Sequence, residues 1–207
     1  MWIGDRYYRV VYPAAADALI DEEDFDRDER LPYWAELWPS AIALARHLQE
    51  EDLTGMRTIE LGCGIGLPTV AALGRGADAL ATDHYEAALD FVRHNARING
   101  APEPRTALLE WHEPEDSREV LAGSFDLVFA ADVLYERPNA VALTKLIPRL
   151  LAPVGEALVA DPGRRWEPLF RDLIHEAGLT VSTDCVVVEQ ENRDVTVVLH
   201  RLRRDGS

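Results

Sequence analysis

From residue 56 onward the chain alternates short apolar runs with longer segments whose apolar residues recur at helical spacing. The short runs predict strands near residues 57–61, 78–82, 105–110, 125–131 and 155–160. The longer segments predict helices near residues 67–75, 85–98, 115–122, 138–151 and 166–177. Strands that alternate with helices across short connections are typical of a parallel sheet covered by helices on both faces.

The two ends of the chain follow different patterns. Two β-rich runs, residues 181–188 and 195–202, flank the polar turn 190–194 and predict an antiparallel hairpin at one edge of the sheet. Near the other end, Pro39 suits the first turn of a helix that runs to about residue 49, and residues 7–12 are a candidate edge strand.

A length of 207 residues allows one domain with a sizeable core. We expect residues 1–50 to form an N-terminal extension and cap, and residues 51–207 to form one compact domain. Seven of the ten residues 21–30 are acidic, which is typical of an exposed loop, with an acidic lip over the site as the alternative.

Composition excludes several classes of protein. Apolar residues make up 47% and charged residues 28% of the chain, as in ordinary globular proteins. No apolar run approaches the roughly 18 residues that a membrane span needs, and the N-terminus lacks a signal-peptide pattern. Neither Cys63 nor Cys185 has metal-ligand spacing, the histidines are scattered, and a disulfide at Cys63 would distort its surroundings. We therefore expect a cytoplasmic protein with no metal site and no membrane partner.

The net charge of −16, from 37 acidic and 21 basic residues, argues against a nucleic-acid partner because phosphates would be repelled. An acidic surface favours encounter with a basic partner such as a lysine-bearing protein, although solubility alone also explains it. We expect a monomer.

The stretch Glu60–Gly66, with the sequence ELGCGIG, is the strongest motif in the chain. It follows a predicted strand and precedes a predicted helix, so Gly62 and Gly64 allow a sharp turn and close approach of a flat ligand. Asp83 closes the next strand 83 − 62 = 21 residues after Gly62, close to the spacing of about 20 at which a carboxylate grips ribose hydroxyls.

The glycine spacing distinguishes between two nucleoside ligands. A dinucleotide-binding fold would place a glycine where this chain has Leu67. Glu60, just before the glycines, would repel a pyrophosphate but suits the amino group of a bound amino acid. A ligand with a ribose and an amino-acid end but no phosphate is S-adenosylmethionine, and NAD is the alternative.

Further polar and aromatic residues follow the predicted strands. Because ligands of open α/β sheets bind beyond the carboxyl ends of the strands, Trp111, Asp132 and Asp161 should face the same site as the glycines. Trp111 could stack on the adenine or serve as a partly buried anchor. Asp132 could hold an incoming amine beside the sulfonium, with Tyr135 as a π face, or it could cap the following turn.

The segment before the first long helix holds two tryptophans. Trp34 is a candidate core residue. Trp38, directly before the helix, could close over a nucleoside or a methyl-accepting amine, and packing in the core is the alternative.

These motifs together resemble class I S-adenosylmethionine-dependent methyltransferases, and within them the seven-strand lysine methyltransferase group. The stretch Glu60–Gly66 is similar to the glycine motif of that group, Asp83 to its ribose-binding acid, and Asp132–Tyr135 to its D-x-x-Y signature. Residues 32–39 and 161–164 resemble the branch that methylates the electron transfer flavoprotein β-subunit. The resemblance covers about residues 31–177.

The resemblance implies a Rossmann-like, doubly wound, mostly parallel seven-stranded sheet with a C-terminal antiparallel hairpin. It implies direct methyl transfer to a neutral lysine amine of a protein, with Asp132 and Tyr135 as the catalytic residues. The residues that would contact S-adenosylmethionine are Trp38, Glu60, Gly62, Cys63, Gly64, Asp83, Trp111 and Ala131. The alternatives are N-methylation of a small amine and a donor-binding regulatory module without turnover.

Overall fold

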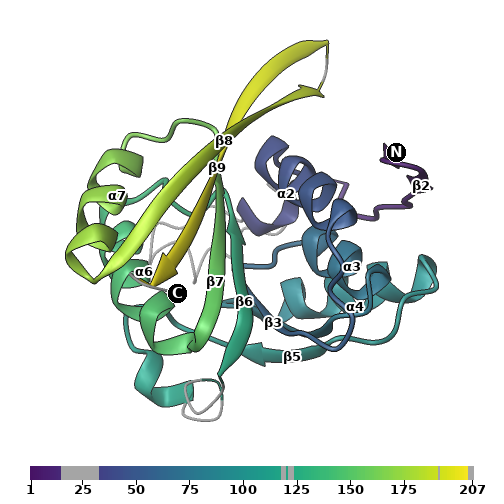
Figure 1. Ribbon diagram of the computed structural model, residues 1–207. Helices are drawn as coiled ribbons and strands as arrows, with labels where there is room; N and C mark the ends of the chain where they lie inside the picture. Colours follow the sequence, from purple (N-terminus) through teal and green to yellow (C-terminus); the bar gives the residue numbers. More distant parts are fainter. Residues whose placement is uncertain (15–32, 118–119, 121–123, 191, 205–207) are drawn as a thin grey trace, which may run out of the picture.

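The structure, a computed structural model, describes residues 1–14, 33–117, 120, 124–190 and 192–204. Its central element is a sheet in which the described part of the chain contributes seven strands, in the order β5-β4-β3-β6-β7-β9-β8 (Figure 1). The strands from β5 to β7 in this order are parallel, and β9 and β8 run antiparallel to their neighbours. Their bounds are β3 Arg57–Leu61, β4 Asp78–Asp83, β5 Arg105–Leu108, β6 Phe125–Ala131, β7 Leu151–Asp161, β8 Leu179–Gln190 and β9 Arg193–Arg204. The predicted Rossmann-like fold with its C-terminal hairpin is confirmed.

Helices cover both faces of this sheet (Figure 1). Along β6, Leu127 and Phe129 belong to one hydrophobic cluster, whereas Val128 and Ala130 belong to the other. Successive side chains of a strand point to opposite faces, which explains why one apolar run supplies two cores. The first cluster holds residues of α2 (Pro39–Glu50), α3 (Leu67–Gly74) and α4 (Glu86–Ile98), and the second holds residues of α6 (Arg137–Leu150) and α7 (Glu167–Glu176).

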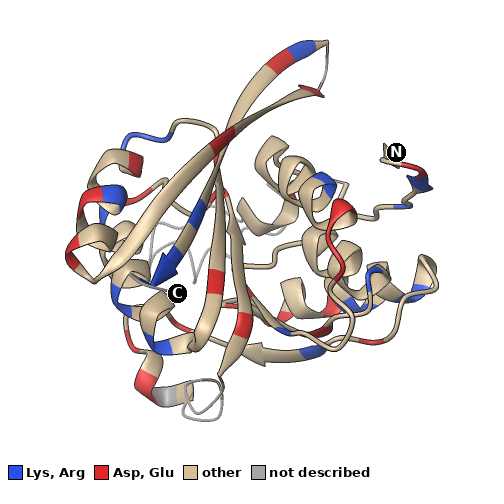
Figure 2. Ribbon diagram, viewed as in Figure 1, with Lys and Arg blue, Asp and Glu red and all other residues tan. Residues whose placement is uncertain are grey.

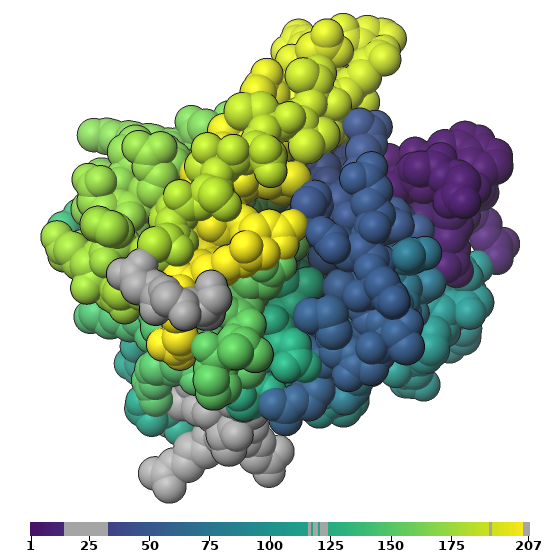
Figure 3. Space-filling model, in the orientation of Figure 1, coloured from purple at the N-terminus to yellow at the C-terminus, as the bar shows by residue number. Residues whose placement is uncertain are grey.

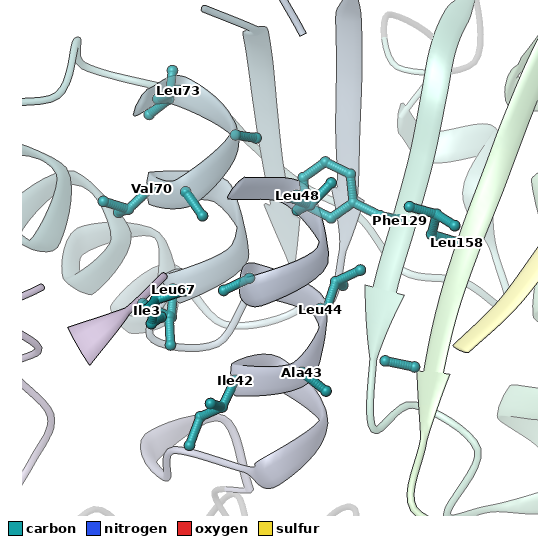
Figure 4. Close-up of a cluster of buried hydrophobic side chains, with 14 of the residues drawn as sticks. Ile3, Ile42, Ala43, Leu44, Leu48, Leu67, Val70, Leu73, Phe129 and Leu158 are labelled. Carbon is teal, nitrogen blue, oxygen red and sulfur yellow. The ribbon is translucent and has the colours of Figure 1, made fainter. Parts of the chain in front are cut away.

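Helix α2 is anchored in the first core. Figure 4 shows Leu44 and Leu48 of α2 pointing toward Phe129 of β6, and all three side chains are fully buried. This packing fixes the start of α2, where Trp38 and Ser40 lie. The division of the chain at residue 50 stays a prediction, and α2, which precedes that point, shares its core with α3.

Some element boundaries differ from those predicted. Strand β5 ends at Leu108 rather than at residue 110, and β7 begins at Leu151, four residues before the predicted start. Where a helix was predicted at 115–122, the structure has a short 3-10 turn, η3 (Pro114–Ser117), and residues 118–119 and 121–122 of the prediction lie outside the described part. The hairpin is longer than predicted, and its tip projects beyond the body of the molecule (Figure 1).

The edge strand expected at residues 7–12 is wrong. Instead, β1 (Trp2–Ile3) pairs with β2 (Arg6–Tyr7) in a separate two-stranded ladder. The backbone of the following residues is bound by side chains of α4 and its C-terminal end: the amide of Asn99 makes two hydrogen bonds with the main chain of Arg9, at 2.9 and 2.7 Å, and the amide of Asn95 makes two with that of Val11, both at 2.9 Å. Figure 3 shows this N-terminal segment lying along the side of the helical layer.

Charged residues are spread over many of the described helices and strands (Figure 2). The acidic segment 21–30 and its alternatives lie outside the described residues. In the described ranges, no helix combines the length and the apolar character needed to cross a bilayer.

Candidate active site

A cleft opens at the carboxyl ends of β3, β4, β5 and β6. Its space, counted out into the solvent at its open mouth, is about 1030 Å³. Ten of the residues that the sequence singled out for the site line this cleft, namely Trp38, Glu60, Gly62, Cys63, Gly64, Asp83, Trp111, Ala131, Asp132 and Tyr135. The topology therefore brings together residues that span almost one hundred positions of the chain. Asp161, which was also expected to face the site, does not line the cleft: it is fully buried, and its carboxylate accepts hydrogen bonds from the Gly163 and Arg164 amides.

The glycine loop has backbone angles that favour glycine. Gly62 and Gly64 have φ values of 73° and 49°. A Cβ atom on Gly62 would lie 3.0 Å from the indole ring of Trp111, and one on Gly64 would lie 3.0 Å from the carbonyl oxygen of Trp34. The two tryptophans thus approach the loop backbone closely, and a Cβ at either glycine would require the neighbouring tryptophan to shift by a few tenths of an ångström.

Gly66 has a structural role that the sequence analysis did not assign. It lies at the start of α3 with a φ of 80°, and a Cβ there would lie 2.1 Å from Cγ2 of Val92. Helix α4 therefore packs directly on the loop. This close contact explains why a glycine is present at residue 66 although the chain lacks the later glycine of a dinucleotide-binding fold.

Asp83 supports the loop as well as lining the cleft. Its Oδ2 accepts a hydrogen bond from the Gly64 amide at 2.9 Å, and its Oδ1 accepts one from the Tyr85 amide at 3.1 Å. Burial raises the pKa of this carboxyl, and the backbone hydrogen bonds oppose that shift. Each carboxylate oxygen has a second lone pair, so Asp83 can still accept hydrogen bonds from ribose hydroxyls.

Glu60 is buried at the end of β3. Its Oε2 accepts hydrogen bonds from the amide of Thr69, at 3.0 Å, and from the Thr69 hydroxyl. Burial nevertheless raises the pKa of Glu60 to about 8. The carboxyl is therefore mostly protonated at neutral pH, and a cationic group entering the cleft would favour its ionised form.

Asp132 lies directly after β6, in a strained position. Its φ is 60°, and its amide donates to the carbonyl of Ala160 at 2.9 Å. Arg164 Nε donates to Asp132 Oδ1 at 2.7 Å, and Ser40 Oγ lies 3.4 Å from Oδ2. The carboxylate thus contacts side chains distant in sequence rather than acting only as a cap of the following turn.

Three aromatic rings stand on this side of the cleft. The Tyr33 ring centroid lies 6.2 Å from that of Trp38 and 5.3 Å from that of Tyr135. The indole nitrogen of Trp38 donates to the carbonyl of Tyr33 at 2.8 Å, which fixes the ring in the cleft wall. We call these three rings the aromatic slot.

Trp34, the candidate core residue, also lines the cleft. Its ring centroid lies 5.6 Å from that of Phe91 on α4, so it packs against the helix while its backbone approaches the glycine loop. Trp111 also lines the cleft and is half-buried against Gly62, as expected of a partly buried anchor, and its stacking on an adenine stays a prediction.

Other chemistries are poorly supported. Cys63 is buried, and burial raises the pKa of its thiol well above the usual value, so the reactive thiolate is disfavoured. Among the described residues, no group of three histidine, cysteine or acidic side chains could hold a metal ion.

Sequence reasoning missed several residues that shape the cleft. Ser40 contacts Asp132, 92 positions away, and Asn95 Nδ2 donates to the Ile65 carbonyl of the glycine loop, 30 positions away, at 2.8 Å. Thr69 binds the Glu60 carboxylate, nine positions before it. Arg164 and Tyr33 lie in the stretches 161–164 and 32–39, which resemble a known branch of the family, but sequence reasoning assigned neither residue a role. Their proximity to Asp132 and Tyr135 becomes visible only in the fold.

Comparisons with known proteins identify a family. A sequence model of a family described as lysine methyltransferase matches residues 28–168. The EEF1A lysine methyltransferase 3 of Mus musculus is 29% identical over 181 residues, which cover 84% of this chain and 74% of that protein. The electron transfer flavoprotein β-subunit lysine methyltransferase of Xenopus laevis is 32% identical over 173 residues, which cover 80% of this chain and 66% of that protein.

A solved structure supports the fold. The crystal structure of magnesium protoporphyrin IX methyltransferase from Synechocystis PCC 6803, with S-adenosylmethionine bound, superposes with a TM-score of 0.62 and 16% identity. The match covers 86% of this chain and 82% of that one.

Proposed function

The chain belongs to the lysine methyltransferase family, and we propose that it transfers the methyl group of S-adenosylmethionine to a lysine side chain of a protein substrate. It is an S-adenosylmethionine-dependent methyltransferase. Two lysine methyltransferases are among its relatives, and the cleft holds a carboxylate and an aromatic slot on the same side. That pairing of Asp132 with three rings is the observation that carries the proposal, because a lysine side chain has an apolar stem and a polar amine.

The cleft fits the methyl donor. Gly62 and Gly64 line the cleft with backbone and no side chain, while Asp83 retains lone pairs for a ribose. We propose that Glu60 faces the ammonium group of the donor, since burial keeps this carboxyl poised to ionise near pH 8. Trp38, Cys63, Trp111 and Ala131 would complete the donor site.

When bound, the donor supplies an electrophilic methyl group on a sulfonium. The protein's own residues then act mainly by alignment, which can contribute roughly 7–11 kcal/mol to lowering a barrier. Asp132 would orient the amine through its carboxylate, and Tyr135, Tyr33 and Trp38 would enclose the lysine stem. No side chain needs to act as a strong base once the amine is neutral.

The setting of the enzyme is part of the same proposal. We propose a cytoplasmic monomer that binds no nucleic acid. Two observations support this: Cys63 and Cys185 are both free, as in reducing compartments, and the net charge is −16.

The test is incorporation of labelled methyl groups into proteins of a cell extract, followed by mass spectrometry of the labelled band. We expect methylated lysine in one or a few proteins. Label confined to small molecules would instead indicate a small-amine methyltransferase, and S-adenosylhomocysteine binding without any labelling would indicate a regulatory module.

The variant Asp132→Asn tests the assignment of the acceptor site. We expect kcat/KM to fall by about 100-fold or more, because misplaced reactants lose alignment, while S-adenosylhomocysteine binding is kept. The matched control is Asp172→Asn, an exposed carboxylate on α7. Turnover of Asp132→Asn at the control's rate would refute the role of Asp132.

A further inference from the structure

Arg164 lies behind the acceptor side of the cleft, in contact with the lining residues Asp132 and Trp38, although no role has been assigned to it. Its Nε donates to Asp132 Oδ1 at 2.7 Å, and its guanidinium carbon lies 5.4 Å from the centre of the Trp38 ring. The pair is largely sheltered, since the Asp132 side chain is 3% exposed and that of Arg164 is 34% exposed. The positive charge therefore contacts both the carboxylate and the aromatic slot.

Backbone hydrogen bonds fix the loop that carries Arg164. Asp161 Oδ1 accepts hydrogen bonds from the amides of Gly163, at 2.8 Å, and Arg164, at 2.7 Å. Gly163 has a φ of 90°, which a side chain would strain. Because Asp132 is itself held by its bond to the Ala160 carbonyl, both members of the pair have fixed backbones.

This arrangement bears on a chemical difficulty of amine methylation. A lysine amine reacts only after it loses its proton, and its ordinary pKa is about 10.4. A lone carboxylate a few ångströms away would favour the ammonium form and raise that pKa by about 1 to 3 pH units. A carboxylate already neutralised by a cation can still accept a hydrogen bond from the amine without this penalty.

We propose that Arg164 is a positioning residue that fixes and neutralises Asp132, so that the acceptor lysine enters the aromatic slot as the neutral amine. This inference rests on the proposed function and assigns a further residue to it. Asp132 Oδ1 is taken by Arg164, whereas Oδ2 has the long 3.4 Å contact with Ser40. Oδ2 is therefore the oxygen that accepts the hydrogen bond from the amine.

The other titratable groups near Asp132 on this side of the cleft do not supply a positive charge that could replace that of Arg164. Those that surround the pair or line this side of the cleft are phenols and acids, namely Tyr33, Glu36, Tyr135, Glu136, Asp161 and Glu167. No lysine or arginine is found among the described residues that line the cleft. Without Arg164, no arginine or lysine would contact Asp132 among the described residues, and its uncompensated carboxylate would favour the ammonium form of the lysine.

The reaction step is balanced without any further reagent. The nitrogen lone pair forms the new N–C bond as the S–C bond breaks, and the bonding electrons remain on sulfur as a neutral thioether. The positive charge passes to nitrogen, and the proton of the methylated ammonium leaves to solvent. Arg164 stays protonated throughout, and hydrogen bonding to Asp132 raises its pKa further.

The first test compares pH–rate profiles of wild type, Arg164→Gln, Arg164→Lys and Arg165→Gln on the labelled extract protein. Arg164→Gln should move the alkaline rise in kcat/KM upward by at least about 1 pH unit, with a loss of about tenfold or more at pH 7 that is recovered at higher pH. Arg164→Lys should keep the wild-type midpoint. Arg165→Gln is the matched control, because the Arg165 guanidinium lies over Trp166, 4.9 Å from its ring centre. A loss of equal size at every pH would show a merely structural role and overturn the proposal.

The second test needs no turnover. Binding of n-butylamine to protein saturated with S-adenosylhomocysteine is measured by calorimetry at pH 7. Arg164→Gln should bind this ammonium at least about tenfold more tightly than wild type or Arg165→Gln, since Asp132 would lack its partner. Equal or weaker binding would overturn the proposal, whereas absence of wild-type turnover with the expected amine binding would count against the proposed function alone.

Discussion

Replacing Gly66 with alanine tests how closely helix α4 packs on the glycine loop. The new Cβ would lie 2.1 Å from Val92 Cγ2, 2.5 Å from Val92 Cβ and 3.0 Å from Val92 Cα. Rotation of the valine about χ1 moves Cγ2 but not Cβ or Cα, so the clash can be relieved only by moving the backbone of α3 or α4.

The expected cost has two parts. A non-glycine residue in the left-handed region costs roughly 1–2 kcal/mol, and overpacking of a filled core adds about 1–3 kcal/mol. Gly66→Ala should therefore lower the free energy of unfolding by about 2–5 kcal/mol, which for a protein of this size lowers Tm by about 4–20 °C.

The control is Gly178→Ala, which has the same kind of backbone but no neighbour. Gly178 has a φ of 82°, and no atom lies within 4 Å of the point that the added methyl carbon would occupy. Gly178→Ala should lower the free energy of unfolding only by the cost of the left-handed backbone, about 1–2 kcal/mol. Both variants are compared with wild type by urea denaturation followed by circular dichroism, with unchanged m-values. An equal loss in the two variants would refute the packing argument.

Three further predictions concern buried polar groups. Burial raises the pKa of Glu60 to about 8, so the folded state keeps this proton over a pH range in which the unfolded chain releases it. The stability of the wild-type protein should therefore fall as pH rises from about 4.5 through 8. Glu60→Gln should remove this slope in urea titrations at pH 5, 7 and 9. Burial lowers the pKa of His200 to about 4, so its ring is neutral at pH 7 despite lying 3.3 Å from Glu167, and stability should be lost as pH falls from 6.5 through 4. His200→Leu should flatten that acid limb in thermal scans. Asn95→Ala should weaken S-adenosylhomocysteine binding measured by calorimetry, because it releases the Ile65 carbonyl, whereas Asn99→Ala, whose hydrogen bonds go to Arg9 and Asn95, should leave affinity near wild type.

Much of the fold could be predicted because its signals are local. The alternation of apolar runs gives the strands and helices, and the glycine loop with Asp83 at the expected offset locates the cleft. The N-terminal segment could not be predicted in this way. Its apolar residues suggest a strand, but its backbone partners are asparagine side chains that lie 84 and 90 positions away.

The acceptor side of the site shows the same limit. The D-x-x-Y motif identified Asp132 and Tyr135, yet nothing local shows that Arg164, 32 positions later, neutralises that carboxylate. The pair forms because β6 and β7 are neighbours and end at the same edge of the sheet. Spacing within one motif cannot reveal a charge supplied by another.

The amide groups of Asn95 and Asn99 engage residues 9 and 11 through peptide N–H and C=O groups. The side chain of Arg9 also donates to the carbonyl of Ile98, whereas Val11 is held through its backbone. Val11 can therefore be exchanged for most other residues without displacing this N-terminal segment. Proline is the exception, because it lacks the N–H that donates to Asn95 Oδ1. The side chain at residue 11 can therefore vary while the backbone of the N-terminal segment keeps the same path along helix α4.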